Sequence, residues 1–381
     1  MQISPFILEQ YFAKHEFTAK YMLSSSDCDG YPMEYILNQA SPDELAMWNS
    51  LTLGYTEGYG SPVLREAICR FYTKAKPENV LAASPGELSF IMMNVIVEQQ
   101  QKKCKPHAVV ISPAYQSLYQ VLKSLDCDIS YWLPENGKYN VDTLESLVKD
   151  ETCLIVINFP HNPTGAYITP NELNQIVEIA RNNNAYLYSD EMYRELILND
   201  DCEKLPAVCD LYEKGISLWG MAKSFGLAGL RIGWFVSQDR GLLSKIHSFK
   251  DYLSICSSAP SEVLSTIALN HSDKFIGPNV QKIKDNISYF KAAIEDGKLP
   301  FVKSFTEPLA GSVSFVEINP AKAGYLLETA PATALEFSNA IVKKYGIMTV
   351  PSPMFEHPGN YLRIGFGRKN FKEVIDMLCL K

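Results

Sequence analysis

The sequence has no long apolar run and no cluster of positive charge. No stretch approaches the ~20 consecutive apolar residues that a membrane-spanning helix requires. The 35 lysines and arginines are scattered and are outnumbered by 43 aspartates and glutamates, which gives a formal net charge of -8. These features argue against a membrane protein and against a partner that is nucleic acid or an anionic membrane surface.

The nine cysteines include no C-x-x-C pair and have no histidine at metal-ligand spacing, so the sequence predicts no metal site. Cys69 and Cys153 lie in apolar stretches, where a free thiol packs as a small hydrophobic side chain. The first residues, MQISPFILEQYFAKHEF, interrupt their apolar positions with charges, which predicts an amphipathic helix and not a signal peptide. We therefore expect a reduced, cytoplasmic location.

Length and composition indicate a folded protein of two unequal lobes. Apolar residues make up 46% of the 381 residues and charged residues 20%, as in soluble globular proteins. A single hydrophobic core stops growing near roughly 250 to 300 residues, so a second, smaller domain is expected. We expect residues 46–275 to form the large domain and residues 276–381 the small one, with residues 1–45 contributing to the small domain.

The large domain alternates short apolar runs with segments of helical periodicity. Such runs are typical of strands covered on both faces, as in a parallel sheet. Thr169-Pro170-Asn171-Glu172 is a capping box that predicts the start of one intervening helix. The fold class is therefore α/β, with a mostly parallel, doubly wound sheet and a smaller α+β domain. The predicted strands are 79–84, 108–112, 128–133, 153–158, 185–190, 215–219 and 231–236.

Four segments place reactive or charged side chains next to these strands. They are NFPHNPTGA (158–166), SDEMYREL (189–196), WGMAKSFGLAGLRIGW (219–234) and NYLRIGFG (360–367). Arg363 puts a guanidinium in an otherwise apolar strand, which is costly without an anionic partner. In this order the segments resemble fold-type I enzymes that depend on pyridoxal phosphate (PLP), specifically the class I and II aminotransferases. The resemblance covers nearly the whole chain.

The resemblance implies a role for each matching residue. Lys223 would hold PLP as a Schiff base and then act as general base at the substrate's Cα. Asp190 would keep the pyridine nitrogen protonated, because a carboxylate favours a neighbouring positive charge. Tyr193 and Asn162 would donate hydrogen bonds to the cofactor's phenolic oxygen, and Tyr115 would stack on its ring.

The resemblance also assigns the anion-binding residues. Arg231 matches the phosphate-binding arginine, and Arg363 the one that grips the substrate's α-carboxylate in a bidentate pair. Tyr55 matches a tyrosine that reaches the phosphate in the other subunit's site, with Tyr59 as the alternative. The chain would therefore act as a homodimer with shared active sites.

The N-terminal segment is expected to line the substrate side of the site, again by resemblance. Ser25, Ser26 and Asp27 would face the substrate there, together with Asn162. If Asp27 points inward, a cationic or hydroxylated side chain would be favoured over an acidic one.

The sequence departs from the family at the phosphate site. Gly220 and Ala222 stand where hydroxyl-bearing residues are usual, and Pro85 opens the phosphate-binding helix without an N–H to donate. We assign Ser84 and Gly86 to the phosphate in their place. With fewer donors, PLP should be held more weakly than in typical relatives.

The expected reaction is amino-group transfer between an amino acid and a 2-oxo acid. An alternative is amino-acid tailoring by elimination or cyclisation. SSSDCDGYPMEYIL, PENGKYNVDTLESL and KDYLSICSSAPSE are similar to the branch that includes capreomycidine synthase, which cyclises a hydroxylated arginine derivative. A non-catalytic PLP-binding regulator is disfavoured, because no basic helix-turn-helix extension is present.

Overall fold

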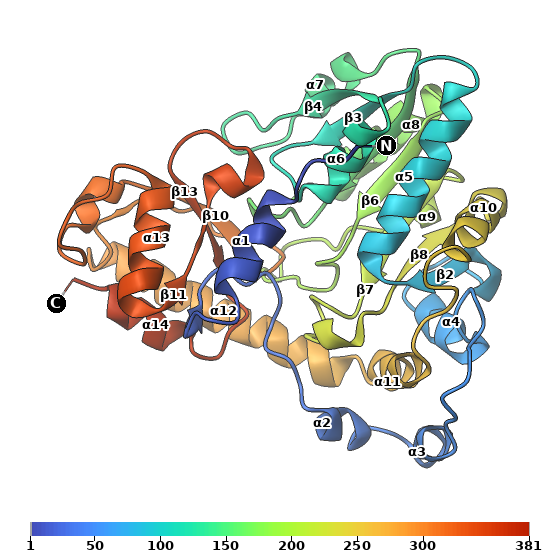
Figure 1. The fold of residues 1–381 in the computed structure, drawn as a ribbon, viewed down its shortest axis with the longest axis horizontal. Helices are drawn as coiled ribbons and strands as arrows, with labels where there is room; N and C mark the ends of the chain where they lie inside the picture. The colour runs from blue at the N-terminus through green and yellow to red at the C-terminus, as the bar shows by residue number, and fades with distance from the viewer. Residues whose placement is uncertain (1, 381) are drawn as a thin grey trace.

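A computed structural model describes residues 2–380. Its main sheet has seven strands in the order β2-β8-β7-β6-β5-β3-β4 (Figure 1). β8 runs antiparallel to both of its neighbours, and the other pairs are parallel. The predicted α/β class with a mostly parallel sheet is confirmed. The strands are β2 (Val80–Ala83), β3 (His107–Ile111), β4 (Asp128–Trp132), β5 (Thr152–Asn158), β6 (Tyr186–Asp190), β7 (Gly215–Gly220) and β8 (Gly233–Ser237).

These strands differ from the predicted ones by no more than two residues at either end. The largest difference is at β8, which begins at Gly233 and not at Arg231. Arg231 has a φ of 55°, in the left-handed region, so the chain turns at this residue before the strand begins. The apolar residues from Ile232 to Val236 follow this turn directly, so the sequence did not separate the turn from the strand.

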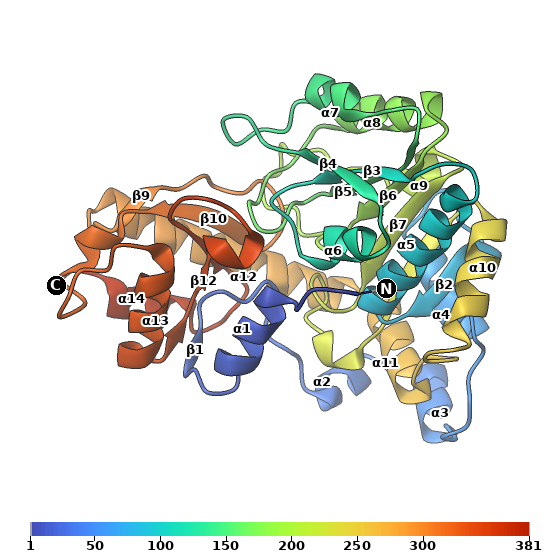
Figure 2. The ribbon, with the colours of Figure 1, turned by 45° about the horizontal axis from the view of Figure 1, so that its top comes forward.

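Helices cover both faces of the main sheet because successive strand residues point to opposite sides. Val109 and Ile155 pack toward α7 (Val141–Leu147), α8 (Pro170–Asn182) and α9 (Val208–Leu211). Val110 and Val156 pack on the other side, toward α5 (Pro85–Gln101), α6 (Ser117–Ser124) and α10 (Arg240–Lys250). Figure 2 shows α7 and α8 on one side of the sheet and α5 and α6 on the other.

The sequence signals for two helices are confirmed. Thr169 accepts a hydrogen bond from the Glu172 N–H and closes the capping box of α8. The N-terminal amphipathic helix is α1 (Ile7–His15), which buries Leu8 and Tyr11. The other helices near the main sheet are α2 (Met33–Leu37), α3 (Pro42–Asn49), α4 (Pro62–Cys69) and α11 (Ala259–Asn270).

A second, antiparallel sheet lies beside the first, in the order β12-β13-β10-β9 (Figure 1). The N-terminal segment joins this part of the chain, because β1 (Tyr21–Met22) pairs with β11 (Ile347–Met348). The remaining elements are β9 (Val302–Ser304), β10 (Val313–Ile318), β12 (Val350–Pro351), β13 (Tyr361–Gly365), α12 (Asp273–Glu295), α13 (Ala334–Tyr345) and α14 (Phe371–Leu378). The domain boundaries at residues 45 and 275 stay a prediction.

The nine cysteines are free thiols. Within residues 2–380, no helix combines the length and the apolar character needed to cross a membrane.

Candidate active site

A cleft of about 630 Å³ lies at the carboxyl ends of the central parallel strands, where ligands bind in sheets of this kind. Asn158 and Asp190 end β5 and β6 and are register partners. α1 and residues 25–27 line the cleft from the side of the second sheet. Of the residues assigned from the sequence, those that line it are Ser25, Ser26, Asp27, Gly86, Tyr115, Asn162, Asp190, Tyr193, Lys223, Arg231 and Arg363.

Lys223 lies in the turn after β7, and its Nζ donates a hydrogen bond of 2.9 Å to the Ser26 hydroxyl. Burial lowers the pKa of Lys223, while the Asp27 carboxylate opposes this shift. A lower pKa increases the fraction of neutral amine, which is the form that attacks a carbonyl carbon and accepts a proton.

Asp190 is a carboxylate that forms no ion pair with any residue from 2 to 380. Its Oδ1 accepts a hydrogen bond of 3.1 Å from the Met192 N–H. Burial raises the pKa of Asp190 from 3.8 to about 6. A group with a protonated ring nitrogen would supply the missing positive charge.

Arg363 has only 2% of its surface exposed and projects from β13 toward the cleft. Its Nε donates to the Ser24 carbonyl at 3.1 Å, and its Nη1 donates to Asn162 Oδ1 at 3.1 Å. Both partners are neutral, and no carboxylate among residues 2–380 forms an ion pair with this guanidinium. A buried cation without a counter-charge indicates a ligand with an anionic group.

Two tyrosines face the cleft from the main sheet side. Tyr193 is 3% exposed, and burial raises its pKa to about 12, a rise that Arg363 and Ser26 oppose. The Tyr115 hydroxyl donates a hydrogen bond of 2.6 Å to Glu9 of α1. The position of the Tyr115 ring is therefore linked to the N-terminal helix.

The predicted phosphate end of the cleft lies where α5 begins. The first hydrogen bond of this helix runs from the Leu88 N–H to the Ser84 carbonyl, so the preceding N–H groups of Gly86 and Glu87 have no partner within the helix. Such groups favour an anion. Ser84 does not line the cleft, but its hydroxyl lies 3.5 Å from Nη2 of Arg231.

The absence of a hydroxyl at position 220 has a steric cause. A Cβ added to Gly220 would lie 2.8 Å from the Gly233 Cα and 2.9 Å from the Ile232 carbonyl oxygen. A Cβ added to Gly233 would in turn lie 2.6 Å from the Pro85 ring. Gly220, Gly233 and Pro85 therefore form one tightly packed group, and the two departures at Gly220 and Pro85 are connected.

Tyr55 does not reach the cleft of its own chain, because its side chain is 88% exposed and lies outside the lining. Tyr59 stacks on His247 with ring centroids 4.2 Å apart. Sequence reasoning missed Glu9 and Glu16, which line the cleft from α1 and the residue that follows it. The amphipathic pattern predicted the helix, but it could not show what the polar side of the helix faces.

The residues of the cleft fit PLP. Lys223 offers an amine of lowered pKa to an aldehyde, and Asp190 offers an unpaired carboxylate to a pyridine nitrogen. Arg231 and the first N–H groups of α5 offer donors to a phosphate.

Comparison with known proteins agrees with this fit. Residues 19–378 match the model of the family described as aminotransferase class I and II. Capreomycidine synthase of Streptomyces vinaceus is 27% identical, over 94% of this chain and 88% of that protein. Aspartate aminotransferase of Sulfolobus acidocaldarius is 24% identical, over 79% and 74%.

Solved structures show the same fold over nearly the whole chain. A PLP-dependent aminotransferase from Streptococcus suis has a TM-score of 0.86 at 26% identity, with 99% of this chain and 96% of that chain covered. The PLP-dependent cyclase OrfR has a TM-score of 0.87 at 23% identity, with 99% and 97% covered. The chain therefore belongs to the aminotransferase class I and II family and is a PLP-dependent enzyme.

Proposed function

We propose that the protein transfers an amino group between an amino acid and a 2-oxo acid, with Lys223 as the covalent anchor of PLP. The observation that carries this proposal is that the Lys223 amine and the uncompensated Arg363 guanidinium line one cleft. When bound, PLP supplies an electron sink that stabilises negative charge at the substrate's Cα.

The residues of the cleft have separate roles in the proposed reaction. Arg363 binds and orients the α-carboxylate of the substrate through two parallel hydrogen bonds. Lys223, as a general base, moves a proton from the substrate's Cα. Asp190 keeps the ring nitrogen of the cofactor protonated, and Tyr193 and Asn162 donate hydrogen bonds to its phenolic oxygen. Tyr115 covers the ring, and α1 limits the access of water.

The charges on the substrate side favour a cationic side chain over an acidic one. Glu9, Glu16 and Asp27 line the cleft, whereas its cations, within residues 2–380, are Lys223, Arg231 and Arg363. Partial burial, together with the charges on Asp27 and Glu9, raises the pKa of Glu16. Since Arg368 pairs with Asp27 at 3.0 Å, Glu16 and Glu9 are the carboxylates that attract a positive group most effectively.

We propose that the enzyme is a cytoplasmic homodimer and that Tyr55 contributes to the partner's phosphate site. An exposed apolar surface around Tyr55 supports this proposal. It consists of Leu53, Tyr55, Tyr252, Leu253 and Ile255, whose side chains are 46% to 89% exposed. The two segments that carry them are joined by a hydrogen bond of 3.3 Å from the Thr56 hydroxyl to the Ser257 carbonyl. An apolar surface of this kind is typical of a protein interface.

A mixing experiment tests the shared site. Tyr55→Phe alone should weaken PLP binding in both sites of the dimer. In a hybrid dimer of one Tyr55→Phe subunit and one Lys223→Ala subunit, one site should carry both substitutions and the other site neither. The site without substitutions should restore part of the activity. No recovery in hybrids, or a monomer by sedimentation, would contradict the proposal.

The second candidate is elimination or cyclisation of an amino acid. The 27% identity to capreomycidine synthase over nearly the whole chain favours it. A panel of amino acids added to the purified PLP form separates the two reactions. A 2-oxo acid with pyridoxamine phosphate supports transfer, and ammonia or a cyclised product with PLP regenerated supports the alternative. Lys223→Ala should abolish both, and activity that persists in this variant would contradict both.

A further inference from the structure

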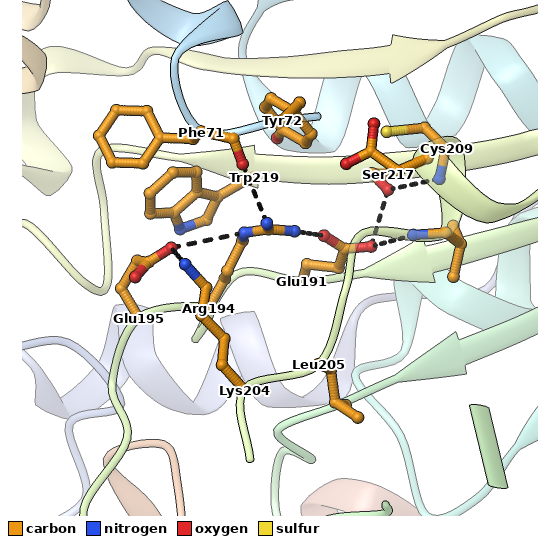
Figure 3. Close-up of polar contacts among 12 residues, drawn as sticks. Phe71, Tyr72, Glu191, Arg194, Glu195, Lys204, Leu205, Cys209, Ser217 and Trp219 are labelled. Atoms are coloured by element: carbon orange, nitrogen blue, oxygen red, sulfur yellow. Dashed lines mark hydrogen bonds and ion pairs between the residues drawn. The ribbon is translucent and has the colours of Figure 1, made fainter. Parts of the chain in front are cut away.

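The turn after β6 presents some of its side chains to the cleft and others to the protein interior. Asp190 and Tyr193 line the cleft, whereas Glu191 and Arg194 are buried and do not line it. Figure 3 shows the side chains of Glu191 and Arg194 directed toward each other. Residues 190–194 therefore carry both kinds of side chain within five positions, since Met192 also lines the cleft. A displacement of the Glu191 or Arg194 side chain would therefore also move the backbone that carries Asp190 and Tyr193.

Glu191 and Arg194 form a buried ion pair. The distance from Arg194 Nη1 to Glu191 Oε2 is 2.8 Å, and the two side chains are 8% and 6% exposed. The other oxygen of Glu191 accepts a hydrogen bond of 2.7 Å from the Ser217 hydroxyl on β7 and one of 3.2 Å from the Val208 N–H. The carboxylate therefore attaches the turn to β7 of the main sheet and to the start of α9 (Figure 3).

The guanidinium of Arg194 attaches the same turn to the segment after α4. Its Nη2 donates a hydrogen bond of 3.0 Å to the Phe71 carbonyl, and it lies over the ring of Tyr72 at 5.0 Å. Glu195 lies 3.5 Å from the Arg194 Nε and also pairs with Lys204. Removal of Arg194 would leave the Glu191 charge buried and without its cation, which is strongly unfavourable.

Ser224 connects this turn to the turn that carries Lys223. Its hydroxyl donates to the main-chain carbonyl of Arg194 and accepts a hydrogen bond of 3.3 Å from Trp219 Nε1. Its own carbonyl accepts a hydrogen bond of 3.1 Å from Asn279 Nδ2. Ser224 directly follows Lys223, and Arg194 directly follows Tyr193. The hydrogen bond between Ser224 and Arg194 thus connects the two turns that carry Lys223 and Tyr193.

We propose that Arg194 and Ser224 are positioning residues that set the placement of Tyr193 relative to Lys223. This inference rests on the roles proposed above for Lys223 and Tyr193. A hydrogen bond from Tyr193 to the cofactor's phenolic oxygen stabilises the negative charge there and thereby changes the proton affinity of the nitrogen of Lys223. A small displacement of the Tyr193 turn would weaken that effect. The two residues therefore tune the pH at which the site is active.

The test is a pH titration of the visible absorbance of the holoenzyme. Ser224→Ala and Arg194→Met should each move the midpoint in the same direction as Tyr193→Phe, by at least about 0.5 pH unit. The midpoint is read only on folded, PLP-loaded protein, so a loss of stability does not change it. If both variants keep the wild-type midpoint while Tyr193→Phe shifts it, the inference is overturned and the role of Tyr193 stands. No shift in Tyr193→Phe contradicts the role of Tyr193 instead.

Arg181 provides a matched control. Its guanidinium also pairs with a carboxylate, Glu213 at 2.7 Å, donates to a main-chain carbonyl, Leu211 at 3.0 Å, and lies over a tyrosine ring, Tyr212 at 4.9 Å. It lies on α8 and does not line the cleft. Arg181→Met should leave the midpoint unchanged, and a shift as large as that of Arg194→Met would overturn the inference.

A double variant tests whether Ser224 acts through Tyr193. If it does, Ser224→Ala should produce a smaller shift in the Tyr193→Phe background than in the wild type, because coupled residues are not additive. Equal shifts in both backgrounds would contradict the inference. Ser224→Ala removes only one hydroxyl, so this test remains available if Arg194→Met does not fold.

Discussion

Arg363 and Asn162 approach each other from different sheets and are joined by a hydrogen bond of 3.1 Å across the cleft. Arg363 lies on β13 of the second sheet, and Asn162 lies in the loop after β5 of the main sheet. The amide oxygen is a neutral acceptor, so the guanidinium keeps a full positive charge for the substrate. This hydrogen bond also connects the second sheet directly to the loop that follows β5 of the main sheet.

Arg363→Lys should lower kcat/KM for all amino acids by roughly 100-fold, because one ammonium cannot replace two charge-assisted hydrogen bonds. Absorbance of bound PLP should be unchanged, since Arg363 is not among the proposed cofactor ligands. Steady-state kinetics and the absorbance spectrum check the two statements. A Lys variant with wild-type kcat/KM would show that Arg363 does not bind the α-carboxylate.

The charge of the cleft predicts a preference between two amino acids of nearly the same shape. Arginine should react faster than citrulline, which replaces the guanidinium with a neutral urea group, and both should react faster than glutamate. Glu16→Gln should lower kcat/KM for arginine about fivefold and leave citrulline unchanged, as expected for an ion pair worth ~1 kcal/mol in a partly exposed site. Single-turnover loss of PLP absorbance measures each rate.

Glu98→Gln is the control for this prediction, since Glu98 is an exposed carboxylate near the far end of α5 that pairs with Lys102. It should affect neither substrate. Equal rates for glutamate and arginine in the wild type would contradict the proposed preference without affecting the proposed reaction.

The packing around Gly220 predicts the effects of two serine substitutions. Gly220→Ser should lower the free energy of unfolding by about 1 to 3 kcal/mol, because its Cβ would overlap the backbone of β8. Ala222→Ser adds a hydroxyl at a position that lines the cleft and should slow the loss of PLP. Dialysis followed by absorbance measures cofactor loss, and urea unfolding measures stability. Undetectable PLP loss from the wild type over days would contradict weak retention.

Asp190 predicts a pH-dependent stability of the apoprotein. Its folded-state pKa of about 6 lies above 3.8, so the folded protein binds this proton more tightly than the unfolded chain does. The stability from this group is complete below about pH 4 and is lost as the pH rises through 6. Asp190→Asn should therefore stabilise the apoprotein at pH 7.5, by at most about 3 kcal/mol, and have little effect near pH 4.

Urea unfolding of both apoproteins at the two pH values checks this prediction. The same substitution should weaken PLP binding, because the amide cannot balance a protonated ring nitrogen. An Asn variant that is less stable than the wild type at pH 7.5 would contradict the uncompensated burial of the carboxylate.

The strands of the main sheet could be predicted because their apolar runs are a local property of the chain. The same runs placed Asn158 and Asp190 at strand ends, and parallel strands bring such ends to one edge. The turn at Arg231 could not be predicted, since no glycine or proline marks its left-handed conformation. The sequence pattern predicted that α1 is amphipathic. It did not predict that Glu9 and Glu16 line the cleft.

The sequence by itself therefore determined the α/β class, the resemblance to PLP enzymes and the choice of candidate site residues, because each depends on residue type and order along the chain. Tertiary structure decided which distant side chains meet. The pairing of β7 with β8 leaves no space for a side chain at Gly220. The buried pair of Glu191 and Arg194 and the hydrogen bond from Ser224 both depend on the packing of distant segments. Phe71 and Arg194, for example, are more than a hundred residues apart in the sequence and are joined by a hydrogen bond.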